Sequence, residues 1–188
     1  MQFKTYNTTL FFKTFLMMLI VSVTLSAQAQ KIKTIGNKLR SGSSNNTFGA
    51  VKGGEVGIKM KAGKKPVKLL KLTFNVDNRQ QDSLPFKVNV YPFTDEKAGE
   101  NLVKQEITSA MAPGKSRPVI DLAPYDIQVS GDILVSIEWL KTSPGMETAF
   151  SIGLFNGGTY HKDSATSDWE KIPVAGIDFN MQVMEIKK

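Results

Sequence analysis

The only histidine of the chain, His161, is the first side chain that could act as a general base. No Gly-x-Ser-x-Gly motif accompanies it, and chain order alone does not define a catalytic triad. Glu138 is the best single carboxylate for glycoside hydrolysis, but that reaction needs a second carboxylate roughly 5–10 Å away, and the sequence identifies none. We therefore expect His161 to be a surface or edge-strand residue, Glu138 to pair with a neighbouring lysine, and the chain not to be an enzyme.

Two polar loops contain oxygen ligands of the kind that calcium prefers. The first contains Asp77, Asn78 and Asp82, and the second contains Asp95, Glu96 and Glu100. A Ca²⁺ ion takes roughly six to eight oxygen ligands, and neither loop has the spacing of an EF-hand. The sequence thus predicts no metal site and no cofactor, with a structural calcium at residues 77–82 as the alternative.

Aromatic residues could form a sugar-binding surface, because a flat ring can stack on a sugar face while its polar edge stays in water. Tyr91 faces outward on a predicted strand, and Tyr125, Tyr160 and Trp169 lie at strand ends or in loops. These four residues are the predicted ligand-binding set. In the alternative interpretation, Tyr125, Trp139 and Trp169 close the ends of the folded domain.

These residues depend on a strand predicted at residues 132–140, where apolar and polar side chains alternate. One side carries Ile133, Val135, Ile137 and Trp139. The other side carries Asp132, Leu134, Ser136, Glu138 and Leu140. A period of two is typical of a strand with one face in a core.

Similar alternation recurs along the chain. It appears at residues 55–60, 67–77, 84–93, 148–155 and 177–186. A turn is predicted at 63–66, because Pro66 cannot donate to a sheet ladder. The predicted core positions include Leu70, Phe150, Ile152 and Leu154, and residues 159–162 are expected to pair back as a short strand.

The spacing of these segments predicts an all-β fold of about eight to ten strands. No long amphipathic helix interrupts them, and residues 101–110 fit either a short strand pair or irregular structure. Connections of mixed length favour a jelly-roll or Greek-key β-sandwich of the galactose-binding-like type over a meander.

The N-terminus has the pattern of a secretory signal peptide. Lys4 and Lys13 give a positive start, and residues 15–23 form an apolar run too short for the roughly 20 residues of a membrane span. Ala27 and Ala29 supply an A-x-A cleavage site. An uncleaved membrane anchor is the alternative.

Cleavage after residue 29 would leave residues 30–188 as a single domain, large enough to hold a core without covalent links. The sequence contains no cysteine, which excludes disulfides, thiolate metal sites and a cysteine nucleophile. No second apolar run follows, so we expect no membrane span in the mature chain and an exported location in the periplasm, at the cell surface or outside the cell.

The formal net charge is +7, and lysines are concentrated between residues 52 and 71. Such a patch could bind an anionic glycan or a lipopolysaccharide phosphate. Alternatively, it is a solvated hairpin whose lysines prevent edge-to-edge pairing. Nucleic acid is not an expected partner, because no recognition module is present.

Several segments resemble a secreted β-sandwich domain that recurs in Bacteroidetes-type bacteria. The segments are Gly54–Lys59, Leu72–Asp77, Phe86–Tyr91, Val119–Asp132, Val135–Leu140, Phe150–Phe155, Thr159–Lys162 and Trp169–Pro173. The resemblance covers nearly all of residues 30–188, although the carboxypeptidase-regulatory-like domain that often precedes this domain is not in the sequence. It implies a jelly-roll-like fold and export, and it supplies no catalytic residues.

Together, these observations predict an exported, non-enzymatic binding or accessory module that recognises a glycan or another envelope protein. A structural or adhesive subunit of the cell envelope is the second hypothesis, and a carbohydrate-active enzyme is the third. An exposed aromatic cluster would favour the first, a large apolar patch the second, and convergent titratable groups in a cleft the third.

Overall fold

The computed structural model describes residues 31–40 and 44–186, with the side chains of 144–147 excepted. Strands dominate this part of the chain, and every strand pairing is antiparallel. The predicted all-β sandwich is therefore confirmed. The predicted signal peptide, residues 1–29, lies outside the described residues. Within them, no helix is long and apolar enough to cross a bilayer.

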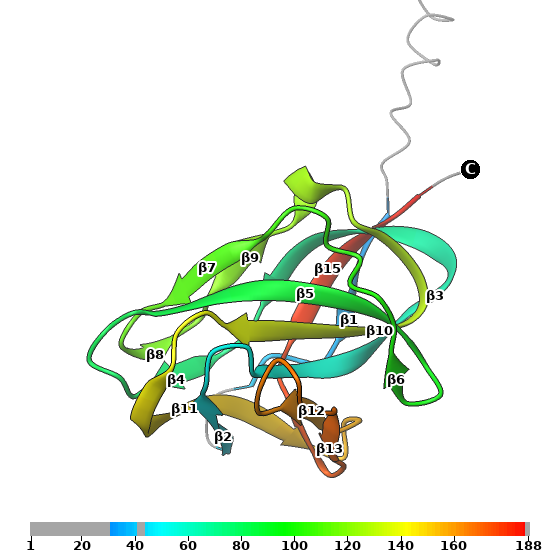
Figure 1. Cartoon of the computed structure of the whole chain (residues 1–188). Helices are drawn as coiled ribbons and strands as arrows, with labels where there is room; N and C mark the ends of the chain where they lie inside the picture. The colour runs from blue at the N-terminus through cyan, green and yellow to red at the C-terminus, as the bar shows by residue number, and fades with distance from the viewer. Residues whose placement is uncertain (1–30, 41–43, 187–188) are drawn as a thin grey trace, which may run out of the picture. The chain divides into compact units, whose positions relative to one another are not determined.

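The strands form two sheets (Figure 1). The larger sheet has the order β1-β15-β3-β10-β5-β6, with β7, β9, β12 and β13 attached, and the smaller sheet has the order β14-β11-β4-β8, with β2 attached. The bounds are β1 Ile32–Gly36, β2 Asn45–Ala50, β3 Glu55–Thr73, β4 Val76–Asn78, β5 Leu84–Thr94, β6 Lys97–Ala98, β7 Thr108–Met111, β8 Gly114–Ser116, β9 Val119–Asp121, a 3-10 helix Ala123–Tyr125, β10 Gln128–Trp139, β11 Ser143–Leu154, β12 Thr159–Lys162, β13 Glu170–Ile172, β14 Ala175–Ile177 and β15 Asn180–Glu185.

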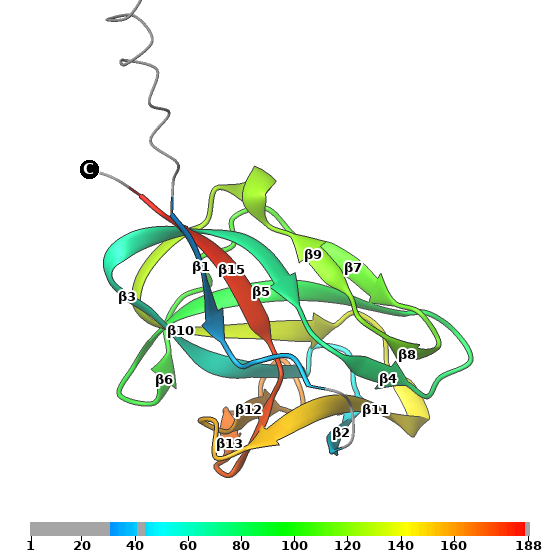
Figure 2. The same ribbon diagram turned by 180° about the vertical axis from the view of Figure 1, so that it is seen from behind.

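The described residues thus contain fifteen strands, more than the eight to ten expected. Much of the excess comes from very short strands, and residues 101–110 are irregular before β7 begins. Neighbours in each sheet are mostly not neighbours in sequence, so the chain repeatedly crosses the sandwich (Figures 1 and 2).

The core lies between the two sheets and is centred on β10. All four side chains predicted for the core face of β10 are buried, including Trp139 at 2% exposure. From the smaller sheet, Phe150 of β11 inserts its ring within about 6 Å of Phe74, Trp139 and Phe179. Aromatic pairs at this separation stabilise a core beyond the area that they bury.

The turn predicted at residues 63–66 is wrong, because β3 runs unbroken from Glu55 to Thr73. Gly63 pairs with Gly131 of β10, and both glycines have positive φ, which allows the paired strands to bend without ending. The first half of β3 then pairs with β10, and its C-terminal half pairs mainly with β15. The lysine-rich stretch is therefore mostly one curved strand and not a hairpin.

Two predicted core positions also differ. Leu70 is half-buried, because a register shift against β15 places Leu69 in the core instead. Leu154 is 61% exposed, since β11 extends beyond the core at this end. The short strand β12 exists, but it pairs with β3 and β13 and not with β11.

Replacing Phe150 with alanine is expected to lower the free energy of unfolding by about 3–5 kcal/mol, because the ring is fully buried among three other aromatic rings. Phe155→Ala is the matched control, since Phe155 is 87% exposed, and it should change stability by less than about 0.5 kcal/mol. Urea unfolding followed by tryptophan fluorescence measures both. Equal losses in the two variants would contradict the assigned core.

Candidate functional site

The face of the larger sheet opposite the main core carries a second, smaller cluster. Leu134, Phe93 and Tyr160 are buried there, and Tyr91 and Trp169 pack against them. The side chain of Leu134 lies on the non-core side of β10, as its place in the alternation predicted. It is nevertheless buried, so the centre of β10 is covered on both faces.

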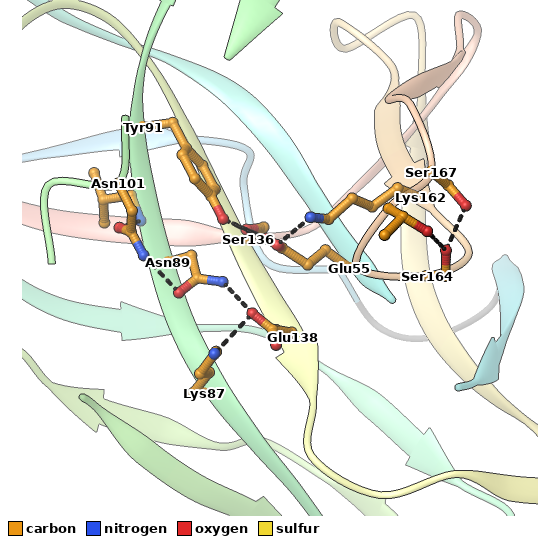
Figure 3. Close-up of polar contacts among 12 residues, drawn as sticks. Glu55, Lys87, Asn89, Tyr91, Asn101, Ser136, Glu138, Lys162, Ser164 and Ser167 are labelled. Atoms are coloured by element: carbon orange, nitrogen blue, oxygen red, sulfur yellow. Dashed lines mark hydrogen bonds and ion pairs between the residues drawn. The ribbon is translucent and has the colours of Figure 1, made fainter. Parts of the chain in front are cut away.

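A buried carboxylate organises the polar part of this face (Figure 3). Glu55 of β3 is 3% exposed and accepts hydrogen bonds from Tyr91 Oη at 2.9 Å and from Ser136 Oγ at 2.5 Å. Lys162 Nζ lies 2.9 Å from Glu55 Oε1. The four side chains come from β3, β5, β10 and β12. A buried charge is tolerated only when it is paired and hydrogen-bonded in this way.

Tyr91 is fixed as a donor in this network. Burial, followed by the nearby Glu55 charge, raises the pKa of Tyr91 well above its ordinary value. The phenol therefore keeps its proton at neutral pH and donates it to Glu55. Its hydroxyl is not free to bind a ligand.

The network continues along β5 and β10 to Glu138 (Figure 3). Glu138 Oε2 lies 3.0 Å from Lys87 Nζ and accepts a hydrogen bond from Asn89 Nδ2 at 2.9 Å. Asn101 in turn donates to Asn89 Oδ1. The predicted pairing of Glu138 with a lysine is confirmed.

Three of the four predicted ligand-binding aromatics gather on this face. Trp169 is half-buried, with Lys162 Nζ 5.5 Å from its ring centroid and the Tyr91 ring at 6.0 Å. Tyr160 is only 3% exposed and packs on Phe93. Tyr91 and Trp169 therefore pack against each other, and Tyr160 packs separately on Phe93.

The fourth predicted aromatic, Tyr125, lies elsewhere. It ends the 3-10 helix between β9 and β10 and packs against the main core. His161 is on β12, half-buried beside Phe48, with Nδ1 3.6 Å from Asp163 Oδ1.

An open cleft of about 550 Å³ lies on the same side of β3. Lys59 and Lys61 of β3, Tyr160 of β12, Lys171 of β13 and Glu96 line it. Further lining comes from Thr34, Ile35, Gly36, Asn37, Met60, Asn156 and Gly157. Sequence reasoning missed this cleft, because its walls come from segments more than a hundred residues apart.

Glu96 links the charged groups of the cleft. One carboxylate oxygen accepts from the Tyr160 hydroxyl and from Lys171 Nζ at 3.0 Å, and the other lies 3.5 Å from Lys59 Nζ. Lys59 also pairs with Asp132 at 3.1 Å. The hydrogen bond from Tyr160, followed by that from Lys171, lowers the pKa of Glu96 to about 2, so Glu96 is ionised at neutral pH.

The backbone at Glu96 is strained. Asp95 and Glu96 are the two central residues of the turn between β5 and β6, with φ of 51° and 58°. Hairpin turns of this kind favour asparagine and glycine, because other residues adopt positive φ at a cost. Strain of this sort is often retained where it places a functional side chain, and here it directs Glu96 to the lysines.

The loop proposed for calcium, residues 77–82, is held together by the side-chain amide of Asn78. Asn78 Oδ1 accepts from Gln80 N, and Nδ2 donates to the carbonyls of Asp82 and Met111. Asp82 lies 3.8 Å from Lys141 Nζ. In the described part of the chain, no three His, Cys, Asp or Glu side chains are grouped so that they could hold a metal ion.

An exposed aromatic beside the cleft was also missed. Phe155 has a φ of 58° and directly precedes the cleft residue Asn156. Its backbone N–H donates to Val174 O at 2.8 Å, and both ends of the Asn156 amide bond to Gly176. These bonds fix the backbone at Phe155, and its ring is 87% exposed at the start of the Asn-Gly-Gly turn. That turn is the sequence signal that could have drawn attention to it.

No protein-family model and no curated protein matches the sequence. Among solved structures, the chain is similar to the cysteine protease and lectin-like domains of Cwp84, a surface layer associated protein of Clostridium difficile. The TM-score is 0.57 at 12% identity over 82% of this chain and 36% of that one. Clostridial Cwp84 after propeptide cleavage gives 0.55 at 11% identity over 82% and 40%. The chain spans about two fifths of those structures, and at this identity the likeness shows a shared fold alone.

Lys162→Met is expected to lower the free energy of unfolding by about 3–5 kcal/mol, because it leaves the buried Glu55 carboxylate without its cation. Adding Glu55→Gln should recover part of that loss. Lys141→Met, at an exposed pair, is the control and should cost less than about 1 kcal/mol. Urea titrations at pH 7 give all three values. A Lys162→Met effect as small as that of the control would refute a stabilising role for this pair.

Stability should depend on pH through Glu96. The pKa of Glu96 in the folded protein, about 2, lies below its ordinary value. Ionised Glu96 therefore stabilises the fold fully at a pH above the ordinary pKa, and this contribution is lost as the pH falls toward 2. Wild type should therefore exceed Glu96→Gln in stability at pH 7 and match it at pH 2. Thermal melts across this range measure the difference, and a gap that does not change with pH would argue against the ion-paired carboxylate.

Proposed function

We propose that this protein is an exported, non-enzymatic binding module that holds a glycan in the cleft between β1, β3, β12 and β13. The observation that carries the proposal is the cluster of Glu96, Lys59, Lys171 and Tyr160, which presents fixed hydrogen-bonding groups in an open, polar hollow. Groups that already share a rigid network lose little conformational freedom when a ligand binds.

The chemistry of the lining suits sugar hydroxyls, which both donate and accept hydrogen bonds. Lys61 and Lys171 supply donors, and Glu96 supplies an ionised acceptor. The volume of about 550 Å³ is within the usual range of small-molecule sites. Phe155 adds an exposed flat ring beside the cleft, so it takes the stacking role first predicted for Tyr160.

Two further points support binding over catalysis. The carboxylates on this face are occupied, since Glu55 is buried beneath Lys162 and Glu138 is held by Lys87 and Asn89. A structure of similar fold carries a lectin-like domain in a surface layer associated protein. The proposal therefore contains no reaction step.

An adhesive subunit is the second candidate. Leu154 and Phe155 at the end of β11 and Val174 before β14 are all large apolar residues exposed to solvent. The hydrogen bond from Phe155 N to Val174 O brings two of them together. Exposed apolar patches mark interaction surfaces, so this end of the smaller sheet would be the contact.

A glycan array on the purified protein tests the proposal. We expect a saturable hit that Lys171→Ala and Phe155→Ala each weaken by about tenfold or more, as for residues that dominate a binding site. Trp169→Ala is the control, because Trp169 does not line the cleft. Loss of the hit in Trp169→Ala alone would move the site to the Trp169 face. No hit at all, with concentration-dependent self-association lost in Phe155→Ala, would replace the glycan proposal with the adhesive one.

A further inference from the structure

A second hollow, of about 110 Å³, lies on the smaller sheet and shares no lining residue with the cleft. Its walls are β4, β8, Ser151 of β11, Asn45 of β2 and the segment at Arg40. The residues that matter for its chemistry are Arg40, Asn75, Asp77, Lys115 and Arg117.

The lining is strongly cationic. Two of the three arginines of the chain, Arg40 and Arg117, meet here with Lys115, whereas Asp77 is the single acidic lining residue. Among the side chains of residues 31–40, 44–143 and 148–186, no carboxylate forms an ion pair with any of these three cations. Asp77 is directly opposite Lys115 across β4 and β8, whereas Arg40 and Arg117 have no such carboxylate, so an anion in the hollow would be attracted to these two arginines.

Arg117 is held in place for such a ligand. Its Nε donates to Asn75 Oδ1 at 2.8 Å. Asn75 is itself fixed, since its Nδ2 donates to Asp178 Oδ2 at 2.6 Å and to the Arg40 carbonyl at 3.0 Å. This anchoring leaves the terminal guanidinium nitrogens of Arg117 as fork-shaped donors, the geometry that matches the paired oxygens of phosphate, sulfate and carboxylate.

We propose that this hollow binds a single oxyanion group, phosphate or sulfate, with Arg117 and Arg40 as the charged donors. The volume suits one such group and not an extended chain. The group could be a free ion or a substituent on a sugar. The site is independent of the proposed glycan cleft.

Calorimetry with the purified protein, at constant ionic strength in chloride, tests this site with inorganic phosphate, sulfate and glucose 1-phosphate as probes. We expect saturable binding that Arg117→Ala weakens by about tenfold, because Arg117 donates through a charge-assisted pair. Arg79→Ala, which removes the same charge from an exposed position outside the hollow, is the matched control.

The outcomes separate the sources of the anion. Equal affinity for inorganic phosphate and glucose 1-phosphate indicates a free oxyanion, and a clear preference for glucose 1-phosphate indicates a group carried on a sugar. Lys171→Ala, in the cleft, should leave either result unchanged. If none of the three probes binds saturably, or if Arg79→Ala weakens binding as much as Arg117→Ala, the site is refuted.

Discussion

The ion pair between Glu55 and Lys162 is the interaction on which the outer face of the larger sheet depends. Residues 55–58 of β3 and 133–137 of β10 are buried on both faces, so Glu55 lies in a part of the sheet that is shielded from water. An apolar side chain at this position would fill the space but would accept no hydrogen bond. Glu55 accepts hydrogen bonds from Tyr91 of β5 and from Ser136 of β10. A single carboxylate thereby ties four strands together.

This pair also explains the position of the cleft. Lys162 ends β12, and its bond to Glu55 lies next to the backbone pairing of β12 with the start of β3. β13 pairs with β12, and this register places Lys171 opposite Tyr160. Glu96 reaches Lys171 from the strained turn between β5 and β6, so the charged residues that line the cleft come from separate segments of the chain.

The two proposed sites would recognise their ligands through different interactions. In the cleft, Lys59 and Lys171 are already neutralised by Glu96 and Asp132, which suits a ligand recognised through hydroxyl groups. In the hollow of the smaller sheet, Arg40 and Arg117 have no carboxylate partner in the described part of the chain, which suits a ligand that carries charge. Both sites contain side chains that hydrogen bonds hold in place. Tyr160 holds Glu96 in the cleft, and Asp178 holds Asn75 in the hollow.

Alternation along the chain was sufficient to predict the all-β class and the core face of β10, because a strand with one buried face records its burial in every second residue. It failed at Gly63 and Leu70, where a bend and a register shift alter the face without altering composition. It placed Leu134 and Ser136 on the non-core side but did not show that both are buried, since a one-faced pattern does not show that a distant hairpin covers the second face. For the same reason the sequence did not show how the aromatic set packs: Tyr91 and Trp169 contact each other, and Tyr160 contacts Phe93. The cleft and the paired charges of Glu96 arise from contacts between residues far apart in sequence, and those contacts exist only once the sheets have curled and stacked.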